Sequence, residues 1–333
     1  MTRSREVHLV SRPEGLPQAS NFEIAAVELP APGEGEVQVR NLFMSVDPYM
    51  RGRMYDRPSY APPFKVGEAM QGGAVGEVTA SNSSAFRPGD LVSSMLGWRE
   101  GFNAKPELLQ KLDAQGLPPQ AFLGVAGMTG MTAWVGLTKI AGIKAGDTVF
   151  VSAAAGAVGQ AVCQIAKIKG ATVIGSAGGP DKCAWVREIG ADHVIDYKAE
   201  ANLSTALGHA APKGIDVYFD NVGGEHLVAA LNAARPFARF ALCGMIAVYN
   251  DTKPQPGPPN LALAVGKRLR LQGFIVSDHA DQSAEFAADM SAWIKAGKIK
   301  WRETIDEGIA SAPGAFLKLF AGENTGKMLV KLA

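Results

Sequence analysis

The stretch from Asp147 to Lys167 constrains the fold of this chain more than any other. Thr148 to Val151 form an apolar, β-branched run, which predicts a strand. Small residues end that run, and apolar residues then return at helical spacing from Val158 onward. A strand, a tight turn and a helix start are typical of the phosphate-binding corner of a dinucleotide fold. Missing side chains let backbone amides approach a pyrophosphate at the positive end of the helix.

The glycine pattern of this turn is incomplete. Ala154 stands where the first glycine of G-x-G-x-x-G would be, while Gly156 and Gly159 hold the other two places. Small residues also let helices pack closely against sheets, so the turn alone leaves a purely structural interpretation open. The rest of the sequence decides between a phosphate-binding turn and a purely structural one.

Strands and helices alternate after residue 125. The pattern predicts strands at 147–152, 171–176, 193–195, 215–220, 237–243 and 271–276, with helices near 157–169, 181–189, 200–209 and 225–234. This alternation predicts an α/β fold with a doubly wound parallel sheet. Before residue 105, short strands and Pro-Gly turns predict a partly open β-barrel. The last thirty residues, with a helix near 314–321 and the strand Lys327–Lys331, are expected to return to that first domain.

Charge and cysteine content restrict the partners and the compartment. The 33 basic and 32 acidic residues leave a net charge of +1, so we expect no binding to nucleic acid or to a membrane surface. The three cysteines, Cys163, Cys183 and Cys243, are an odd number without ligand-like spacing, which favours a reducing compartment. The N-terminus lacks the apolar core of a signal peptide. We therefore expect a cytoplasmic protein.

The end of the second predicted strand bears on the choice of cofactor. NAD-binding corners place an acidic residue about 20 positions after the glycines, where it binds the ribose hydroxyls. Here no acid occupies the strand tip near Ser176, and Lys182 lies just beyond it. A lysine at this place suits a 2′-phosphate, so NADPH is preferred to NADH. The alternative is that Lys182 is an ordinary exposed lysine of a helix.

Four further stretches, 45–52, 127–133, 218–225 and 243–250, together resemble a known family in order and spacing. They read SVDPYMRG, GMTGMTA, YFDNVGGE and CGMIAVYN, and the similarity extends to ENTGK at 323–327. The family is the zinc-independent medium-chain dehydrogenase/reductases. The most similar branch is the NADPH-dependent alkenal/one reductases, which include prostaglandin reductase, leukotriene B4 12-hydroxydehydrogenase and curcumin reductase.

The resemblance implies a domain organisation and a cofactor site. It implies a GroES-like β-barrel domain over 1–126 and 298–333, a Rossmann domain over 127–297, and a homodimer. It implies that NADPH is bound by Gly156, Ala157, Val158, Gly159, Lys182, Tyr197, Asn221, Cys243, Gly244, Met245, Ile246, Ala247, Val248, Tyr249, Phe274, Ile275, Val276 and Asn324. Residues 277–279, Ser-Asp-His, depart from the family pattern beside the expected substrate pocket.

The expected reaction follows from the absence of a set of zinc ligands in the sequence. No cysteine precedes Cys163 and His8 is the only early histidine, so we expect no metal. Without a Lewis acid, hydride transfer to the β-carbon of an enone or enal is easier than transfer to an isolated carbonyl. The resulting enolate oxygen needs a hydrogen-bond donor. Tyr249 is the first candidate for this donor and Tyr49 the second, although each could instead be a half-buried core tyrosine.

Two other functions stay open on the sequence: a quinone reductase on the same fold, and a crystallin-like NADPH-binding protein with little turnover. Tyr249 and Lys253 also match the Tyr-x-x-x-Lys pair of short-chain dehydrogenases, but that pair needs a helical turn, and four prolines between 254 and 259 disfavour it. The same prolines predict either a rigid lid over the substrate or a plain connection to a helix near 260–266.

Overall fold

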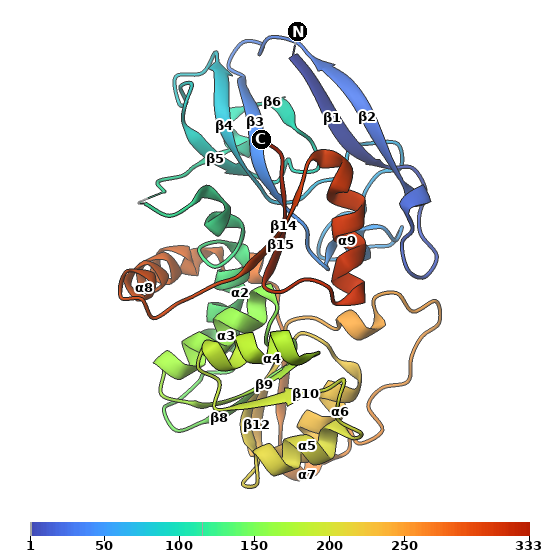
Figure 1. The fold of residues 1–333 in the computed structure, drawn as a ribbon, viewed down its shortest axis with the longest axis vertical. Coiled ribbons are helices and arrows are strands. Elements are labelled where there is room, and N and C mark those ends of the chain that lie inside the picture. The colour runs from blue at the N-terminus through green and yellow to red at the C-terminus, as the bar shows by residue number, and fades with distance from the viewer. Residues whose placement is uncertain (1, 115) are drawn as a thin grey trace. The chain divides into compact units, whose positions relative to one another are not determined.

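The structure is a computed structural model that describes residues 2–114 and 116–333. The chain divides into two compact units. The first unit comprises Met1–Gly124, Glu303–Asn324 and Met328–Ala333, and the second comprises Val125–Arg302 and Thr325–Lys327. Each is described by itself below (Figure 1).

The first unit is built on an antiparallel β-sheet. Its strands are β1 (Thr2–Leu9), β2 (Phe22–Leu29), β3 (Val37–Ser45), β4 (Ala74–Ser81), β5 (Leu91–Ser94), β6 (Gly101–Ala104), β7 (Gln110–Lys111), β14 (Glu303–Glu307) and β15 (Lys327–Lys331). The main sheet has the order β14-β15-β3-β4-β5-β7, with β6 also paired to β3, while β1 and β2 form a separate hairpin. Two helices, α1 (Met50–Arg53) and α9 (Ala312–Ala321), complete the unit.

An aromatic cluster joins the two ends of the sequence inside this unit. Trp98 stacks on Phe22 with ring centroids 6.4 Å apart, and Phe316 of α9 meets Trp98 edge-on at 6.2 Å. Trp98 and Phe316 are fully buried. Burial of rings of this size makes a large contribution to stability, so the C-terminal helix is part of the core of the first unit.

The second unit is a doubly wound parallel sheet. Its strands are β8 (Thr148–Val151), β9 (Thr172–Ala177), β10 (His193–Asp196), β11 (Ile215–Asp220), β12 (Ala234–Leu242) and β13 (Arg270–Gly273). All pairings are parallel, and the spatial order is β10-β9-β8-β11-β12-β13. In chain order this is 3-2-1-4-5-6, the order of a Rossmann fold, and the predicted fold class is confirmed.

Helices cover both faces of this sheet (Figure 1). They are α2 (Met128–Val135), α3 (Ala157–Ile168), α4 (Pro180–Glu188), α5 (Leu203–Ala210), α6 (Gly224–Ala233), α7 (Leu263–Lys267) and α8 (Ser283–Lys295). The strands alternate between two cores: Val149 and Val151 face the cluster that holds α3, whereas Phe150 faces the one that holds α5 and α6. Period-two alternation with both faces apolar explains why these strands are continuous hydrophobic runs.

Some elements differ from the sequence-based expectation. The strand predicted to reach Val276 ends at Gly273, because the chain turns into a 3-10 helix over Val276–Gln282. The helix predicted from residue 200 begins at Leu203, where the side chain of Asn202 accepts the amide of Thr205. Helix α8 was not predicted. None of the helices in the described residues is both long and apolar enough to cross a membrane.

A buried histidine gives the second unit a pH-dependent stability. His226 of α6 is 5% exposed and its ring stacks on Phe150. Its Nε2 lies 3.0 Å from Ser176 Oγ. Burial lowers the pKa of His226 from 6.5 to about 4. Below pH 6.5 the unfolded chain therefore binds a proton that the folded chain does not, so stability falls as the pH falls towards 4.

We expect the free energy of unfolding to fall by roughly 2 kcal/mol from this group between pH 7.5 and 5.0. Urea unfolding at the two pH values measures it. The variant His226→Gln keeps a neutral hydrogen-bonding side chain and should lose that part of the difference. An unchanged pH difference in the variant would assign the effect to other groups.

Candidate cofactor and active site

The predicted cofactor residues of the second unit gather at one edge of its sheet. In a parallel sheet the carboxyl ends of all strands meet at the same edge, and ligands bind there at the point where the strand order reverses. Here that point lies between β8 and β11. The predicted residues follow directly on strand ends: Gly156 to Gly159 after β8, Lys182 after β9, Tyr197 after β10, Asn221 after β11, Cys243 to Tyr249 after β12, and Phe274 to Val276 after β13.

The turn after β8 is tight enough to exclude side chains. Ala153 adopts a left-handed conformation with φ 47°, and its carbonyl accepts the amide of Gly156 at 2.9 Å. A methyl group on Gly159 would overlap that carbonyl and lie 2.8 Å from Cα of Ala154. Gly159 is therefore required by the close contact of the first helical turn with the strand end, as the fingerprint demands.

Ala154, which replaces the first glycine of the pattern, is accommodated by a glycine on the neighbouring strand. Its amide donates to the carbonyl of Ser176 at 2.8 Å, and its side chain is fully buried. A methyl group on Gly175 of β9 would lie 2.9 Å from Cβ of Ala154. The space that Ala154 needs is thus provided across the sheet by Gly175.

The start of helix α3 offers the positive end of a helix to an anion. Gly156 is the residue before the helix, and the first amide bonded back within it is that of Gln160, to the carbonyl of Gly156 at 3.0 Å. The amides of Ala157, Val158 and Gly159 precede it and have no acceptor in the helix, as in every α-helix. The geometry fits a pyrophosphate.

A short C-terminal segment supports this turn from the other side. The amide of Gly326 donates to the carbonyl of Ala155 at 2.7 Å, and Gly326 forms a bridge with Gly156. Gly326 has φ 71°, and a methyl group there would overlap the carbonyl of Arg302. Residues 325–327 are therefore fixed against the turn by backbone contacts that only glycine permits.

Asp220, at the end of β11, holds the loops at the switch point together. Its Oδ1 accepts from the hydroxyl of Tyr218 at 2.7 Å and from the amides of Val222 at 2.9 Å and Gly223 at 2.7 Å. Its carbonyl accepts the amides of Cys243 and Gly244 at 2.9 and 3.0 Å. Burial raises the pKa of Asp220 above its usual value, although these donors oppose the shift. Asp220 was not predicted as a site residue.

Ser152 connects Asn221 to the end of β8. The amide of Asn221 donates to Ser152 Oγ at 2.8 Å, and its side-chain amide donates to the Ser152 carbonyl at 2.8 Å. These bonds orient Asn221 at the point where the strand order reverses. Ser152 was also missed, because its role depends on a partner 69 positions away.

Tyr249 follows β12 in a loop that lies against the loop after β11. The amide of Ala247 donates to the carbonyl of Val222 at 3.1 Å. The hydroxyl of Tyr249 accepts the amide of Met245 at 3.2 Å, so its own proton is directed to another acceptor. Burial raises the pKa of Tyr249, which keeps the phenol protonated at neutral pH. Burial also raises the pKa of the Cys243 thiol to about 12, so Cys243 is not a nucleophile there.

Lys182 and Tyr197 lie on neighbouring loops at the same edge. Lys182 is in the first turn of α4, where burial lowers its pKa. Tyr197 directly follows β10 and is 39% exposed, with its ring edge-on to His226 at 5.1 Å. A methyl group on Gly178 would lie 2.9 Å from the Tyr197 hydroxyl. Tyr197 can pack this closely against the loop after β9 only because Gly178 has no side chain.

Tyr49 and Asn324 belong to the first unit, and their part in the site stays a prediction. The Tyr49 hydroxyl is buried, and among the described residues no hydrogen bond of standard geometry reaches it. Burial raises the pKa of Tyr49, and the charge of Asp47 adds to the shift while nearby Arg53 opposes it. Tyr49 is therefore a neutral phenol at physiological pH.

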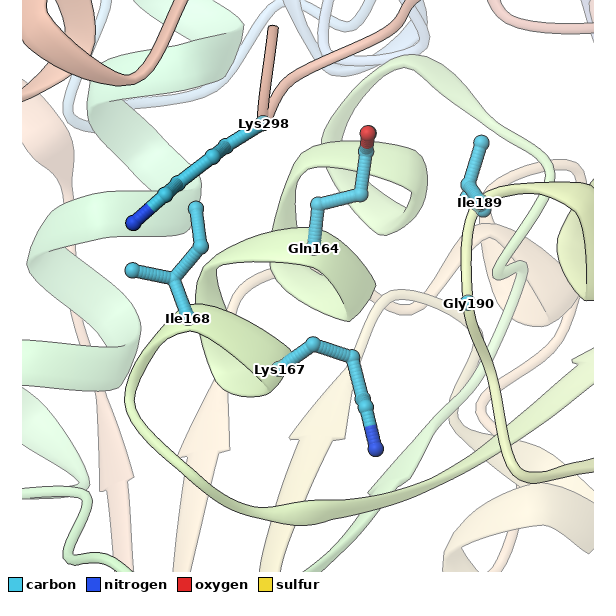
Figure 2. A pocket seen from close by; sticks show the side chains of 6 residues that line it. All are labelled: Gln164, Lys167, Ile168, Ile189, Gly190 and Lys298. Carbon is cyan, nitrogen blue, oxygen red and sulfur yellow. The ribbon is translucent and has the colours of Figure 1, made fainter. Parts of the chain in front are cut away.

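A shallow hollow of about 410 Å³ lies elsewhere on the second unit (Figure 2). Two of its polar side chains have partners within the chain. Lys167 Nζ contacts both carboxylate oxygens of Asp192 at 2.8 Å, and Gln164 binds the backbone of Lys300 through both ends of its amide. The hollow has no part in the cofactor site. Across the described residues, no group of three or more His, Cys, Asp or Glu side chains is arranged to hold a metal ion.

Two family profiles match the chain. Residues 5–112 match a family described as the N-terminal domain of oxidoreductase, and residues 157–296 match one described as zinc-binding dehydrogenase. The chain is 42% identical to the NADPH-dependent curcumin reductase of Escherichia coli (strain K12) over 337 residues, covering 99% of this chain and 97% of that protein. It is 43% identical to prostaglandin reductase 1 of Bos taurus over 321 residues, covering 95% of each.

A solved structure is similar over nearly the whole chain. The crystal structure of CurA in complex with NADPH from Vibrio vulnificus matches with a TM-score of 0.94 and 43% sequence identity, covering 99% of each chain. A sequence identity of 43% indicates that the two proteins share a family as well as a fold.

Proposed function

The chain belongs to the zinc-independent medium-chain dehydrogenase/reductases, in the branch of the curcumin and prostaglandin reductases, and on that premise we propose its activity. It is an NADPH-dependent reductase of the carbon–carbon double bond of α,β-unsaturated aldehydes and ketones. The observation that carries this conclusion is the full-length similarity to reductases of this branch, together with an NADPH-bound relative. The GroES-like and Rossmann fold predicted from the sequence is the fold of this family.

We propose that the turn after β8 and the start of α3 hold the pyrophosphate, because Gly156 and Gly159 leave only backbone amides there. Lys182 and Tyr197 bind the 2′-phosphate. The remaining contacts come from Asn221, from the segment Cys243 to Tyr249, from Phe274 to Val276 and from Asn324.

NADPH, when bound by these residues, would supply a hydride to the β-carbon of the substrate. As this carbon–hydrogen bond forms, the π electrons of the double bond move towards the carbonyl, and negative charge develops on its oxygen. We propose that the hydroxyl of Tyr249 donates a hydrogen bond to that charge, directly or through the ribose hydroxyl. Its raised pKa keeps the proton available. The α-carbon then takes a proton, and the saturated carbonyl compound is released.

We propose that the first unit, predicted as residues 1–126 and 298–333, is the substrate domain. Tyr49 supplies a second neutral hydroxyl there. Its buried oxygen has hydrogen-bonding capacity that no described residue uses in standard geometry. An apolar enone or enal suits such a site because it needs few polar partners.

We further propose that the protein is a cytoplasmic homodimer. In the described part of the chain β13 is an edge of the six-stranded sheet, paired only with β12. Phe237 is 67% exposed on β12 and Val265 is 81% exposed on the adjacent α7. An uncovered sheet edge beside exposed apolar side chains favours association. The three cysteines are all free, which agrees with a reducing compartment.

A substrate panel with isotope tracing tests the activity. We expect NADPH to be consumed with enals and enones, and we expect saturated alcohols not to reduce NADP⁺. With NADPH that carries deuterium at both positions of nicotinamide C4, mass spectrometry should find one deuterium at the β-carbon of the saturated product. Deuterium at the carbonyl carbon would contradict double-bond reduction.

Assays with quinones distinguish the proposed enone reductase from a quinone reductase. Turnover of quinones without enones would make the protein a quinone reductase, and tight NADPH binding without turnover of either class would indicate a crystallin-like protein. We expect enones to be the better substrates, since one hydride donor and a neutral phenol are sufficient for that reaction.

A further inference from the structure

An aspartate ties together the two loops that carry the predicted 2′-phosphate residues. Asp196 is the last residue of β10, and its Oδ1 accepts the amide of Gly179 at 2.9 Å and that of Lys198 at 3.1 Å. Gly179 is the residue before helix α4, so the start of this helix and the turn after β10 are held by one oxygen. The negative charge of Asp196 faces two amide dipoles, which offset it.

This connection brings a second lysine to the site. Lys182 lies in the first turn of α4, three residues after Gly179, and Lys198 lies two residues after Asp196. Burial is the main cause that lowers the pKa of Lys182, and the positive charge of Lys198 lowers it further. The two ammonium groups therefore repel each other. Like charges held close together are unfavourable unless an anion lies with them.

Gly178 lets the side chains of Tyr197 and Lys198 pack closely against the loop after β9. A methyl group on Gly178 would lie 2.9 Å from the hydroxyl of Tyr197 and 3.0 Å from Cε of Lys198. The stem of Lys198 and the phenol end of Tyr197 thus border the same small volume. Lys198 is exposed, so its charge is available to a ligand.

We propose that Lys198 is a specificity-determining residue that binds the 2′-phosphate of NADPH together with Lys182 and Tyr197. The inference rests on the proposed function, since it assumes that NADPH is the cofactor. Two cations and a phenol can donate to all three oxygens of a phosphate dianion, whereas the 2′-hydroxyl of NADH offers them no charge.

The test compares Lys198→Gln with Lys198→Arg and with Lys182→Gln. Lys213→Gln is the matched control, because Lys213 is an exposed lysine just before β11, at the opposite end of the strands from the site. Steady-state kinetics give kcat and KM with NADPH and with NADH. Calorimetry gives the affinities of adenosine 2′,5′-bisphosphate and adenosine 5′-monophosphate at low and moderate salt.

We expect Lys198→Gln to raise KM for NADPH about tenfold. It should leave kcat and the KM for NADH unchanged. The affinity for adenosine 2′,5′-bisphosphate should fall by a similar factor and depend less on salt, while adenosine 5′-monophosphate should bind as before. Lys198→Arg should restore most of the affinity, and Lys213→Gln should behave as the unmodified protein.

Two outcomes would overturn the proposal. A normal KM for NADPH in Lys198→Gln, with a raised one in Lys182→Gln, would remove Lys198 from the site and leave the proposed cofactor intact. Equal losses with NADPH and NADH would mean a general structural effect. A different result would contradict the proposed cofactor itself. The unmodified protein would then bind adenosine 2′,5′-bisphosphate and adenosine 5′-monophosphate equally well.

Discussion

Replacing Gly159 with alanine should strongly weaken NADPH binding. The added methyl group would overlap the carbonyl oxygen of Ala153 and lie 2.8 Å from Cα of Ala154, and both are backbone atoms at the end of the central strand. The helix start can accommodate the methyl only by moving away from β8, and the amides of α3 would then no longer converge on a pyrophosphate. We expect the dissociation constant for NADPH to rise about 100-fold and the protein to lose roughly 2–3 kcal/mol of stability.

Gly156→Ala is the matched control for this prediction. Gly156 has φ −80° and ψ 175°, a conformation that any residue adopts, and its added methyl would lie 3.1 Å from the Ala153 carbonyl oxygen. A few tenths of an ångström of relaxation are sufficient there, so we expect less than about a fivefold loss of affinity. Fluorescence titration with NADPH measures both variants, and thermal unfolding with and without NADPH separates loss of binding from loss of folding. Equal behaviour of the two alanine variants would show that the close contact at Gly159 is not what shapes the phosphate site.

Local sequence patterns were sufficient to predict the doubly wound sheet. Runs such as Thr148–Val151 and residues 217–219 are apolar on both faces, and helical spacing follows each of them. These signals depend only on neighbours in the chain, so they are visible without a structure. The predicted cofactor residues came mainly from the family resemblance, and the alternation explains why those of the second unit lie at strand ends, because parallel strands share one carboxyl edge.

The parts that escaped prediction depend on residues distant in sequence. Ala154 is tolerated in place of glycine because Gly175, on the next strand, leaves room for its methyl group. Ser152 and Asp220 become partners only when β8 and β11 pair. A pattern within one segment carries no information about such contacts, since they depend on strand order and register.

Lys198 is a further residue whose place in the site could not be predicted from local sequence. In the sequence it is one lysine in a polar turn, whereas Lys182 could be recognised by its distance from the glycine turn. Only the shared bonds of Asp196 to Gly179 and Lys198 reveal that the two loops meet. Specificity for a charged group is therefore harder to predict than the fold that carries it.

Replacing Tyr249 with phenylalanine should reduce kcat about 100-fold, because loss of one oxyanion donor typically costs this much. The KM for NADPH should change little, since the ring and the backbone of the loop remain. The Met245 amide loses its acceptor, which should lower stability by about 1 kcal/mol. Because burial raises the pKa of Tyr249, its donor form persists as the pH rises, and we expect kcat of the unmodified enzyme to stay level between about pH 7 and 9.

Tyr218→Phe separates the catalytic effect from the structural one. Tyr218 is fully buried and its hydroxyl donates to Asp220 at 2.7 Å, so this variant should lose stability without losing kcat. Single-turnover measurement of NADPH oxidation with a saturating enone isolates the hydride step in both variants. If Tyr249→Phe and Tyr218→Phe slow that step equally, Tyr249 acts only through the packing of the loops around Asp220. A selective loss in Tyr249→Phe means that the developing charge on the substrate oxygen is stabilised by a neutral hydroxyl at the edge of the sheet.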